Sequence, residues 1–294
     1  MTLAARGLSY AYLPGRPVIQ EVSFALVPGE VVFLLGANGS GKTTLIECLG
    51  GLRVPAEGEV VLDGRPVRSC SAAARARSIG YVPQLHQLAF GFSAWEVVLM
   101  GRAPHVGWLS RPGRADRAAA ADALRTLGLW DLAGRTFPTL SGGEQRLVLI
   151  ARGLAQRVRY LLLDEPDAHL DPANQHRVLA AAQGLARAGI GVVVTTHNPN
   201  NALLYADRVM VLAGGRSLVD GAPAAVLTPE VLSAAYGIPF EVVGDGQGPR
   251  AFLPRLGDHR ARSLTSSEAE SASGSARPHS PSSRASSAAT ANGA

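Results

Sequence analysis

The sequence predicts an α/β fold built around a parallel β-sheet that is covered by helices. Short apolar runs recur along the chain between helical segments, and each run is apolar at nearly every position rather than at alternate positions. Strands of this kind are buried on both faces, which is typical of a parallel sheet between helices. The runs lie at Val31–Leu35, Ile79–Val82, Tyr160–Leu163, Gly191–Thr195 and Val209–Leu212.

Two further regions precede or interrupt this core. Residues Leu3 to Phe33 contain short β-rich segments separated by Pro14-Gly15 and Pro28-Gly29, and these turn dipeptides predict a small N-terminal antiparallel β subdomain. Strand patterns then disappear between residues 85 and 159, where helical patterns such as Ala115–Leu127 predict an inserted helical subdomain.

Composition restricts where the protein acts. Of the 294 residues, 47% are apolar and 17% charged, which is typical of a globular chain. The apolar runs are far shorter than the roughly 18 residues that cross a bilayer, and Met1 to Pro17 lack the apolar segment of a secretory signal. The two cysteines, Cys48 and Cys70, form no disulfide framework or metal cluster. We expect a cytosolic protein whose membrane role, if it has one, is peripheral.

Charge and tail composition add two expectations. The net charge of +5 comes from scattered arginines without a basic block or interleaved aromatics, so we expect no nucleic-acid partner. Beyond Gly257 the chain is rich in Ser and Ala, with Leu264 as its only large aliphatic residue. Such a segment buries too little apolar surface to offset the entropy of ordering. We therefore expect a folded domain over residues 1–257 and a disordered tail over 258–294.

A glycine-rich segment carries the first functional motif. Residues Gly36 to Thr43 follow the pattern G-x-x-x-x-G-K-[ST], between an apolar run and the helical run Thr44–Leu49. In a loop of this kind, backbone N–H groups and a helix N-terminus face the phosphates. Lys42 is expected to bind the β- and γ-phosphates, and Thr43 to place its hydroxyl on Mg²⁺. A glycine-rich turn with an unrelated lysine is the alternative. The motif predicts a P-loop NTPase (RecA-like) core that binds ATP through Gly36, Ala37, Asn38, Gly39, Ser40, Gly41, Lys42, Thr43 and Thr44.

Lys42 is also the only lysine among the 28 basic residues of the chain. All the remaining Lys and Arg positions of the chain hold arginine, and only this one holds lysine. This usage indicates that arginine cannot replace it.

Two acidic residues follow the apolar run Tyr160–Leu163 and form the second motif. Asp164, at the end of the predicted strand, is placed to support a magnesium shell. Glu165 would face the γ-phosphate, where a carboxylate can polarise the attacking water. Taken alone, the two acids could cap a helix. Together with the phosphate-binding loop, they form a Walker B element.

A third motif identifies the family. Leu140 to Glu144 resembles the ABC signature and precedes the Walker B element at the spacing typical of that family. The sequence from about residue 3 to 256 therefore resembles the ATP-binding subunits of ABC transporters. The resemblance implies that the signature residues also contact ATP. They are Ser141, Gly142, Gly143 and Glu144.

The same resemblance assigns several single residues. It implies that Tyr12 stacks on adenine, that Gln84 is the Q-loop residue and a ligand of Mg²⁺, and that Asp171 belongs to the D-loop His169-Leu170-Asp171. It also implies that His197 is the switch histidine, which contacts the γ-phosphate and acts in catalysis with Lys42 and Glu165. Standing alone, Tyr12 could be a surface aromatic, Gln84 a loop amide and His197 a capped core histidine.

The signature also implies partners. Ser141 could act only as a helix N-cap, but the same helix start can bind a γ-phosphate. In this family two subunits stack head to tail, and each signature closes over the ATP of the other. The resemblance thus implies a homodimer on the cytoplasmic face of the cell membrane, bound to permease subunits and indirectly to a substrate-binding protein.

Two segments narrow the transporter type. Val97–His105 and Val219–Val243 resemble importers for iron-siderophore, haem and cobalamin complexes, so uptake of a metal chelate is the expected function. An importer for molybdate or another solute is the first alternative. A soluble ABC ATPase is the second, although such proteins carry a long coiled-coil insertion or two cassettes, and this sequence has neither. The expected permease contact is the region after Gln84 and the surface near Met100 to Trp108, which carries an apolar patch, with ordinary core packing as the alternative. The patch comprises Phe90, Phe92, Trp95, Val106 and Trp108.

Three positions depart from the common family pattern. Asn198 follows the switch histidine where Asp is frequent, and Asp167 replaces the usual Thr or Ser. Gly153 lies inside the predicted signature helix, where glycine costs about 1 kcal/mol relative to alanine. None of the three removes a catalytic group.

Overall fold

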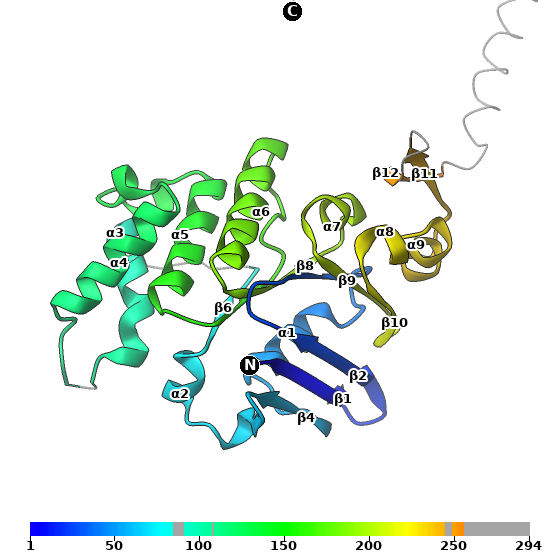
Figure 1. Ribbon diagram of the computed structural model, residues 1–294, viewed down its shortest axis with the longest axis horizontal. Coiled ribbons are helices and arrows are strands. Elements are labelled where there is room, and N and C mark those ends of the chain that lie inside the picture. Colours follow the sequence, from blue (N-terminus) through cyan, green and yellow to red (C-terminus); the bar gives the residue numbers. More distant parts are fainter. Residues whose placement is uncertain (85–90, 108, 245–248, 256–294) are drawn as a thin grey trace, which may run out of the picture. The chain divides into compact units, whose positions relative to one another are not determined.

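A mostly parallel sheet forms the centre of the described part of the chain (Figure 1). The computed structural model describes residues 1–84, 91–107, 109–244 and 249–255. Within these residues the sheet has the order β10-β9-β3-β8-β7-β6, and only the β9–β10 pair is antiparallel. Its strands are β3 (Val31–Leu35), β6 (Ile79–Val82), β7 (Tyr160–Leu163), β8 (Gly191–Thr196), β9 (Arg208–Ala213) and β10 (Arg216–Gly221). The strands predicted from the apolar runs are thus confirmed.

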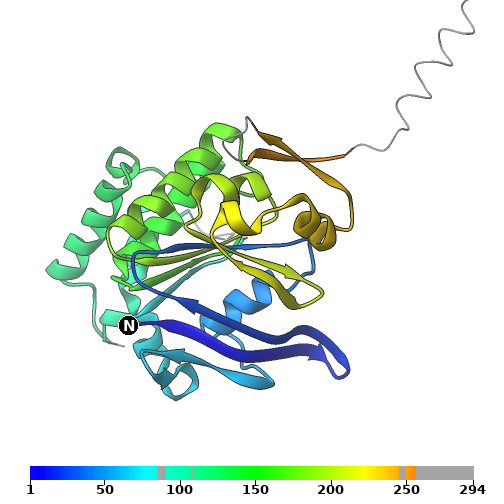
Figure 2. The ribbon, with the colours of Figure 1, turned by 45° about the vertical axis from the view of Figure 1, so that its right-hand side comes forward.

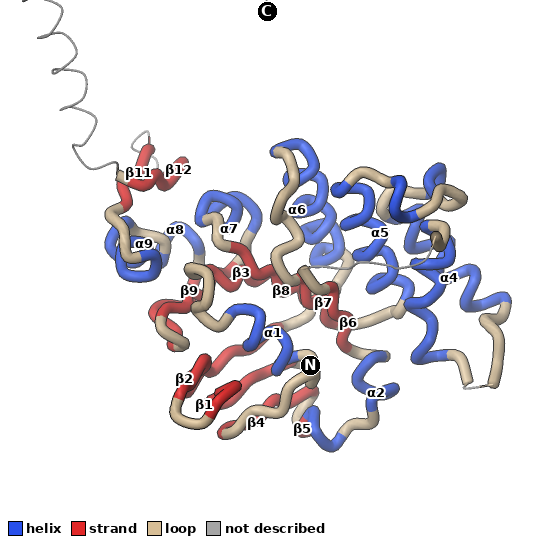
Figure 3. Tube along the Cα trace, turned by 180° about the vertical axis from the view of Figure 1, so that it is seen from behind, coloured by secondary structure: helices blue, strands red, loops and turns tan. Residues whose placement is uncertain are grey.

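The continuous apolar pattern of these strands reflects two separate cores. In β3, Val31 and Phe33 pack with the helices on one face of the sheet, whereas Val32 and Leu34 pack on the other face. That second face is covered by α1 (Lys42–Leu49). Figure 3 shows α1 on one side of the row of strands and α5, α6 and α7 on the other. Both faces of β3 are buried, so every position needs an apolar side chain.

The N-terminal antiparallel sheet is also confirmed, but two of its four strands come from residues 57–66, beyond the predicted Leu3 to Phe33. Its order is β2-β1-β4-β5, and Figure 2 shows its long hairpin beneath α1. Gly15, with φ of 74°, makes the tight turn of that hairpin, because glycine adopts positive φ without strain. The strands are β1 (Leu3–Leu13), β2 (Arg16–Leu26), β4 (Glu57–Leu62) and β5 (Arg65–Pro66).

Helices fill the described chain between β6 and β7, as predicted for the inserted subdomain. Buried residues of α3, α4 and α5, including Val97, Leu124 and Val148, share one core. Arg102 anchors this region, because its buried guanidinium donates to Asp116 Oδ1 at 2.9 Å and to the carbonyl of Ala155 at 2.8 Å. The helices are α2 (Ala72–Ala76), which precedes β6, then α3 (Ala94–Leu99), α4 (Arg114–Thr126) and α5 (Gly142–Ala155), and α6 (Pro172–Arg187), which follows β7.

Shorter elements complete the chain. Turns of 3₁₀ helix lie at Val67–Ser69, Met100–His105, Trp130–Leu132 and Phe137–Thr139. The C-terminal elements are α7 (Pro199–Tyr205), α8 (Pro223–Val226), α9 (Pro229–Tyr236) and the hairpin of β11 (Phe240–Gly244) with β12 (Pro249–Pro254). None of the helices in the described ranges is long and apolar enough to cross a membrane. The predicted tail, 258–294, lies outside the described residues.

The structure describes part of the apolar patch predicted as a permease contact. Phe92 and Trp95 are partly buried against the core of the helical region, and Trp95 also meets Trp130 edge to face at 6.2 Å. Val106 is half-buried, while Phe90 and Trp108 lie outside the described residues. The permease contact therefore stays a prediction.

Candidate functional site

The phosphate-binding loop connects β3 to α1. A Cβ atom at Gly36 would collide with the carbonyl oxygen of Leu212, and one at Gly41 would lie 2.8 Å from that of Val18. Gly41 also has φ of 102° and supplies no side-chain cap to α1. The first N–H groups of this helix are therefore free of a side-chain acceptor at its N-cap, and they can bind an anion.

Lys42 occupies the centre of this loop. Its Nζ donates to the carbonyl oxygens of Gly36 at 2.8 Å and Ala37 at 3.0 Å, and it lies 3.9 Å from Glu165 Oε1. Burial lowers the pKa of Lys42, while the charges of Glu165 and Asp164 act in the opposite direction. The loop thus holds a nearly buried ammonium group beside two carboxylates.

Asp164 follows β7 and is almost fully buried. Its Oδ1 accepts hydrogen bonds from Thr195 Oγ1 at 2.6 Å and from Thr43 Oγ1 at 3.1 Å. The Tyr81 hydroxyl donates to Oδ2 at 3.4 Å, and burial followed by the charge of Asp164 raises the pKa of that phenol. These contacts place Thr43 and Asp164, two of the three predicted magnesium ligands, side by side.

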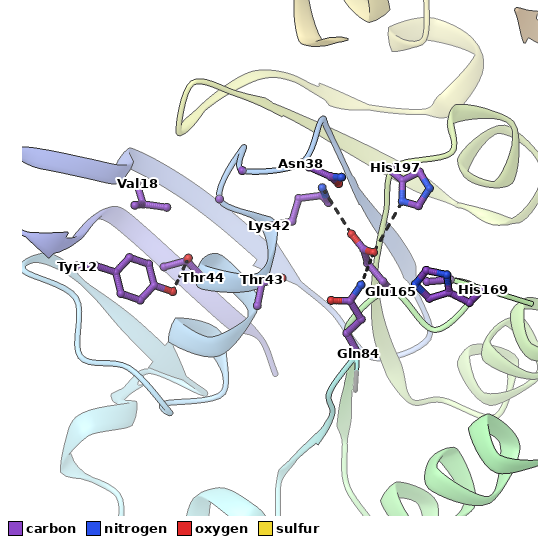
Figure 4. Close-up of a pocket in the computed structure, with 13 residues that line it drawn as sticks. Tyr12, Val18, Asn38, Lys42, Thr43, Thr44, Gln84, Glu165, His169 and His197 are labelled. Carbon is purple, nitrogen blue, oxygen red and sulfur yellow. Dashed lines mark hydrogen bonds and ion pairs between the residues drawn. The ribbon is translucent and has the colours of Figure 1, made fainter. Parts of the chain in front are cut away.

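Glu165 is the point at which the predicted catalytic residues meet (Figure 4). Its Oε2 accepts a hydrogen bond from Gln84 Nε2 at 2.9 Å and lies 3.8 Å from His197 Nδ1. Its backbone has φ of 42°, and its N–H donates to Thr195 Oγ1 at 2.8 Å. A positive φ is uncommon for a residue with a side chain, and it occurs here at the end of a buried strand.

Tyr12 lies at the far side of the same cavity, about half exposed. Its hydroxyl is 3.1 Å from Thr44 Oγ1, and the guanidinium carbon of Arg53 lies 4.7 Å from its ring centroid. Arg53 is held by Glu47 and by the Tyr10 hydroxyl. The ring is therefore fixed at the cavity wall, where an aromatic surface can stack on a base.

These residues surround one cavity of about 790 Å³. The structure brings together predicted site residues from five separate segments of the sequence. It adds Val18, Ala168 and His169, of which His169 has φ of 61°. The resemblance had placed His169 in the D-loop without a role at the nucleotide, and Ala168 lies three residues after Glu165. No sequence signal marked Val18. The full lining is Tyr12, Val18, Asn38, Gly39, Gly41, Lys42, Thr43, Thr44, Gln84, Glu165, Ala168, His169 and His197.

The signature residues do not line this cavity. Ser141 caps α5 by accepting from the Glu144 N–H, and Glu144 Oε2 accepts in turn from the Ser141 N–H at 2.8 Å. The Ser141 hydroxyl also donates to Glu144 Oε2 at 2.9 Å. The hydrogen bonds to this carboxylate from the Ser141 N–H and, second, from the Ser141 hydroxyl lower the pKa of Glu144. A Cβ atom at Gly143 would collide with the Asn174 side chain at the start of α6. Asp171, which caps α6, also lies outside the cavity lining.

Comparison with known proteins decides the family. Residues 19–168 match the family model described as ABC transporter. The chain belongs to the ABC transporter ATP-binding family. It is similar to the hemin import ATP-binding protein HmuV of Nocardia farcinica, at 47% identity over 83% of this chain and 85% of the relative. A relative of the same name from Myxococcus xanthus is 43% identical over 83% of this chain and 92% of its own.

Solved structures agree with this assignment. One described as an inward-facing conformation of a metal-chelate type ABC transporter has a TM-score of 0.77 at 33% identity, covering 87% of this chain and 98% of its own. The cbiO1 protein of Clostridium perfringens, part of the transporter complex cbiONQ, has a TM-score of 0.67 at 29% identity, covering 76% of this chain and 89% of its own. The predicted ABC ATPase fold is confirmed, and this ABC protein is an ATPase whose activity is coupled to transport.

The structure shows which contacts are made at the three positions that depart from the ABC pattern. The buried Asp167 accepts hydrogen bonds from Thr196 Oγ1 at 2.9 Å and Asn201 Nδ2 at 2.6 Å, which ties the Walker B loop to the switch loop. Asn198 caps α7 through the Asn200 N–H at 3.0 Å. Gly153 faces β7 closely, since a Cβ atom there would lie 2.7 Å from Leu161 Cδ1.

Proposed function

We propose that this ABC ATPase powers the import of a metal chelate, with haem as the favoured cargo. The observation that carries the proposal is the 47% identity to a hemin import ATP-binding protein over most of both chains. The likeness to a metal-chelate type transporter supports the same class of cargo. The residues of the cavity serve ATP, so the cargo proposal rests on these relatives and not on the site.

For ATP binding, the cavity supplies groups for each part of the nucleotide. Tyr12 stacks on the base, and the N–H groups at the start of α1 receive the phosphates. Lys42 exchanges its contacts with Gly36 and Ala37 for phosphate oxygens, which are stronger partners for an ammonium group. Ser40 Oγ is buried and has no hydrogen-bond partner among the described residues, which suits a phosphate at this loop.

Hydrolysis requires an activated water and a stabilised γ-phosphate. Glu165 is the proposed base, because its carboxylate lies between Gln84, Lys42 and His197 at the edge of the cavity. It orients the attacking water and accepts its proton. Lys42 and His197 stabilise the charge on the transferred phosphoryl group.

The site also fits Mg²⁺. Thr43 Oγ1, Asp164 Oδ1 and the amide oxygen of Gln84 are hard oxygen ligands of the type that Mg²⁺ prefers. Among the residues that the structure describes, no cluster of three or more His, Cys, Asp and Glu side chains could hold a metal alone. A bound Mg²⁺ would therefore complete its shell with phosphate oxygens and water, and would neutralise phosphate charge.

We further propose that two copies work as a head-to-tail homodimer. Ser141 to Glu144 and Asp171 lie outside the cavity, so a single chain does not bring its signature to its own nucleotide. The exposed start of α5 is suited to close over the ATP of a second copy. The dimer would bind permease subunits at the cytoplasmic face of the membrane, near Met100 and Val106, and receive cargo from a substrate-binding protein.

Reconstitution tests this proposal. The chain is purified with its cognate permease, placed in liposomes with ATP inside, and supplied with the binding protein loaded with haem, cobalamin or a ferric siderophore. We expect haem to enter with ATP and to stimulate ATP hydrolysis. Uptake of another solute with no uptake of haem would refute the cargo assignment, and ATP hydrolysis without any uptake would favour a soluble ATPase.

A further inference from the structure

Tyr236, the last residue of α9, contacts the segment of the switch histidine from outside the known motifs. Its hydroxyl donates a hydrogen bond to the backbone carbonyl of His197 at 2.8 Å. The phenol therefore ties the C-terminal helix to the loop of the switch histidine.

The phenol is kept in its neutral, donating form. Burial raises the pKa of Tyr236, and the charge of Glu165 raises it further, while the N–H of Gly36 acts in the opposite direction. A proton is therefore always available for the hydrogen bond to His197 at physiological pH.

The helix that carries Tyr236 is well fixed. Thr228 caps its start, and Gly237, with φ of 71°, ends it in the left-handed conformation. Ser233 Oγ accepts from the Phe240 N–H at 3.0 Å, and the ring of Phe240 lies 5.5 Å from that of Tyr236. These contacts hold the hydroxyl at a defined position relative to the sheet.

The side chain of His197, in contrast, is loosely held. It is 55% exposed, and its Nδ1 is 3.8 Å from Glu165, which is beyond hydrogen-bond distance. Its direction toward the cavity is therefore set mainly by its backbone. That backbone follows β8 and is fixed on one side by Thr196, whose hydroxyl donates to Asp167.

We propose that Tyr236 is a positioning residue for ATP hydrolysis, which acts by fixing the backbone of His197. This inference rests on the proposed role of His197 at the γ-phosphate. The segment after β10 lies far in the sequence from the motifs, and this proposal gives it a part in ATP hydrolysis.

Replacing Tyr236 by phenylalanine tests the inference, because it removes one oxygen and keeps the ring against Phe240. We expect Tyr236→Phe to lower the kcat for ATP hydrolysis about threefold to tenfold, the range for one lost hydrogen bond. The KM for ATP should stay within about twofold, since Tyr12 and the phosphate loop are untouched. Tyr205→Phe is the matched control. It removes a hydroxyl bonded to His176 on another surface and should leave both constants unchanged.

A double-mutant cycle separates positioning from a general loss of structure. His197→Ala should lower kcat strongly, and adding Tyr236→Phe to it should cause no further loss, because the phenol acts through His197. An equal loss in both backgrounds, or a wild-type kcat in Tyr236→Phe, would overturn the inference. A wild-type rate in His197→Ala would instead refute the proposed role of the histidine.

Discussion

The amide Nε2 of Gln84 donates a 2.9 Å hydrogen bond to Oε2 of Glu165. Gln84 is the second residue after β6 and Glu165 the second after β7, and these two strands are neighbours in the sheet. Because Lys42 lies near the other carboxylate oxygen, Glu165 is held from two sides before any water is activated. The orientation of the proposed base is therefore a property of the sheet edge and not of Glu165 alone.

Glu165→Gln should keep ATP binding and block hydrolysis. The glutamine amide has the same shape, and its oxygen can still accept from Gln84, but it cannot accept a proton from water. We expect hydrolysis to fall at least about a hundredfold, the lower end for loss of a general base. With Mg-ATP the variant should accumulate as a dimer in size-exclusion chromatography. ADP serves as the control, and a monomer with every nucleotide would contradict the shared-site arrangement.

Lys42 should tolerate neither alanine nor arginine. Its side chain is 4% exposed and donates to Gly36 and Ala37 inside the loop, where a planar guanidinium is too large. We expect Lys42→Ala to lower hydrolysis by about a hundredfold or more, as for one lost charge at a transition state, with the fold intact. Lys42→Arg should behave alike. Steady-state ATPase assays with circular dichroism decide this, and near-wild-type activity of the arginine variant would disprove the steric argument.

The main strands and the phosphate loop could be predicted because their signals are local. An apolar run such as Val31–Leu35 carries its own evidence of burial on both faces, and the adjoining glycines and Lys42 specify a phosphate loop. The contact between Tyr236 and His197 has no such local signal, since it depends on how two distant segments pack. The same holds for Val18, which lines the cavity from β2.

Composition alone left one region undecided. Phe92 and Trp95 are apolar residues in a region with few charges, a pattern that fits either a contact surface or a core. Only the packing of the helices distinguishes the two, and it assigns both residues to the edge of the core. Gly153 shows a different limit of the sequence. Its position inside a helix predicted a cost in stability, but only the structure shows that the close approach of Leu161 leaves little room for a side chain there.

Gly153 and Gly184 form a pair for testing that reason. In α5 a methyl group at residue 153 would lie 2.7 Å from Leu161 Cδ1 in the buried core, whereas in α6 residue 184 is exposed and has no neighbour within 4 Å. Alanine gains about 1 kcal/mol of helix propensity at each site, but overpacking costs about 1–3 kcal/mol. Gly153→Ala should therefore destabilise the protein by about 1 kcal/mol, while Gly184→Ala stabilises it by about 0.5–1 kcal/mol. Urea unfolding measures both, and stabilisation by Gly153→Ala would show that Leu161 can move aside.

The Arg102–Asp116 pair should make stability depend on pH in the acid range. The hydrogen bond from the Arg102 guanidinium, followed by that from the Gly113 N–H, lowers the pKa of Asp116 below its ordinary value of 3.8. A carboxyl group whose pKa is lower in the folded state adds stability above pH 3.8, and this stability is lost as the pH falls through the folded-state pKa.

Asp116→Asn isolates this contribution. The change leaves the buried guanidinium of Arg102 with the Ala155 carbonyl but without its carboxylate, and we expect a loss of about 2–3 kcal/mol at neutral pH, since an unpaired buried charge is costly. Asp122→Asn on the same helix is the control. Its side chain is 67% exposed and pairs with Arg125 at 3.7 Å, so its removal should change stability by less than about 0.5 kcal/mol. Urea unfolding from pH 7 to pH 3 should show the difference between wild type and Asp116→Asn shrinking below about pH 4. A difference that stays constant over this range would mean that packing around Arg102, and not the charge of Asp116, stabilises the region.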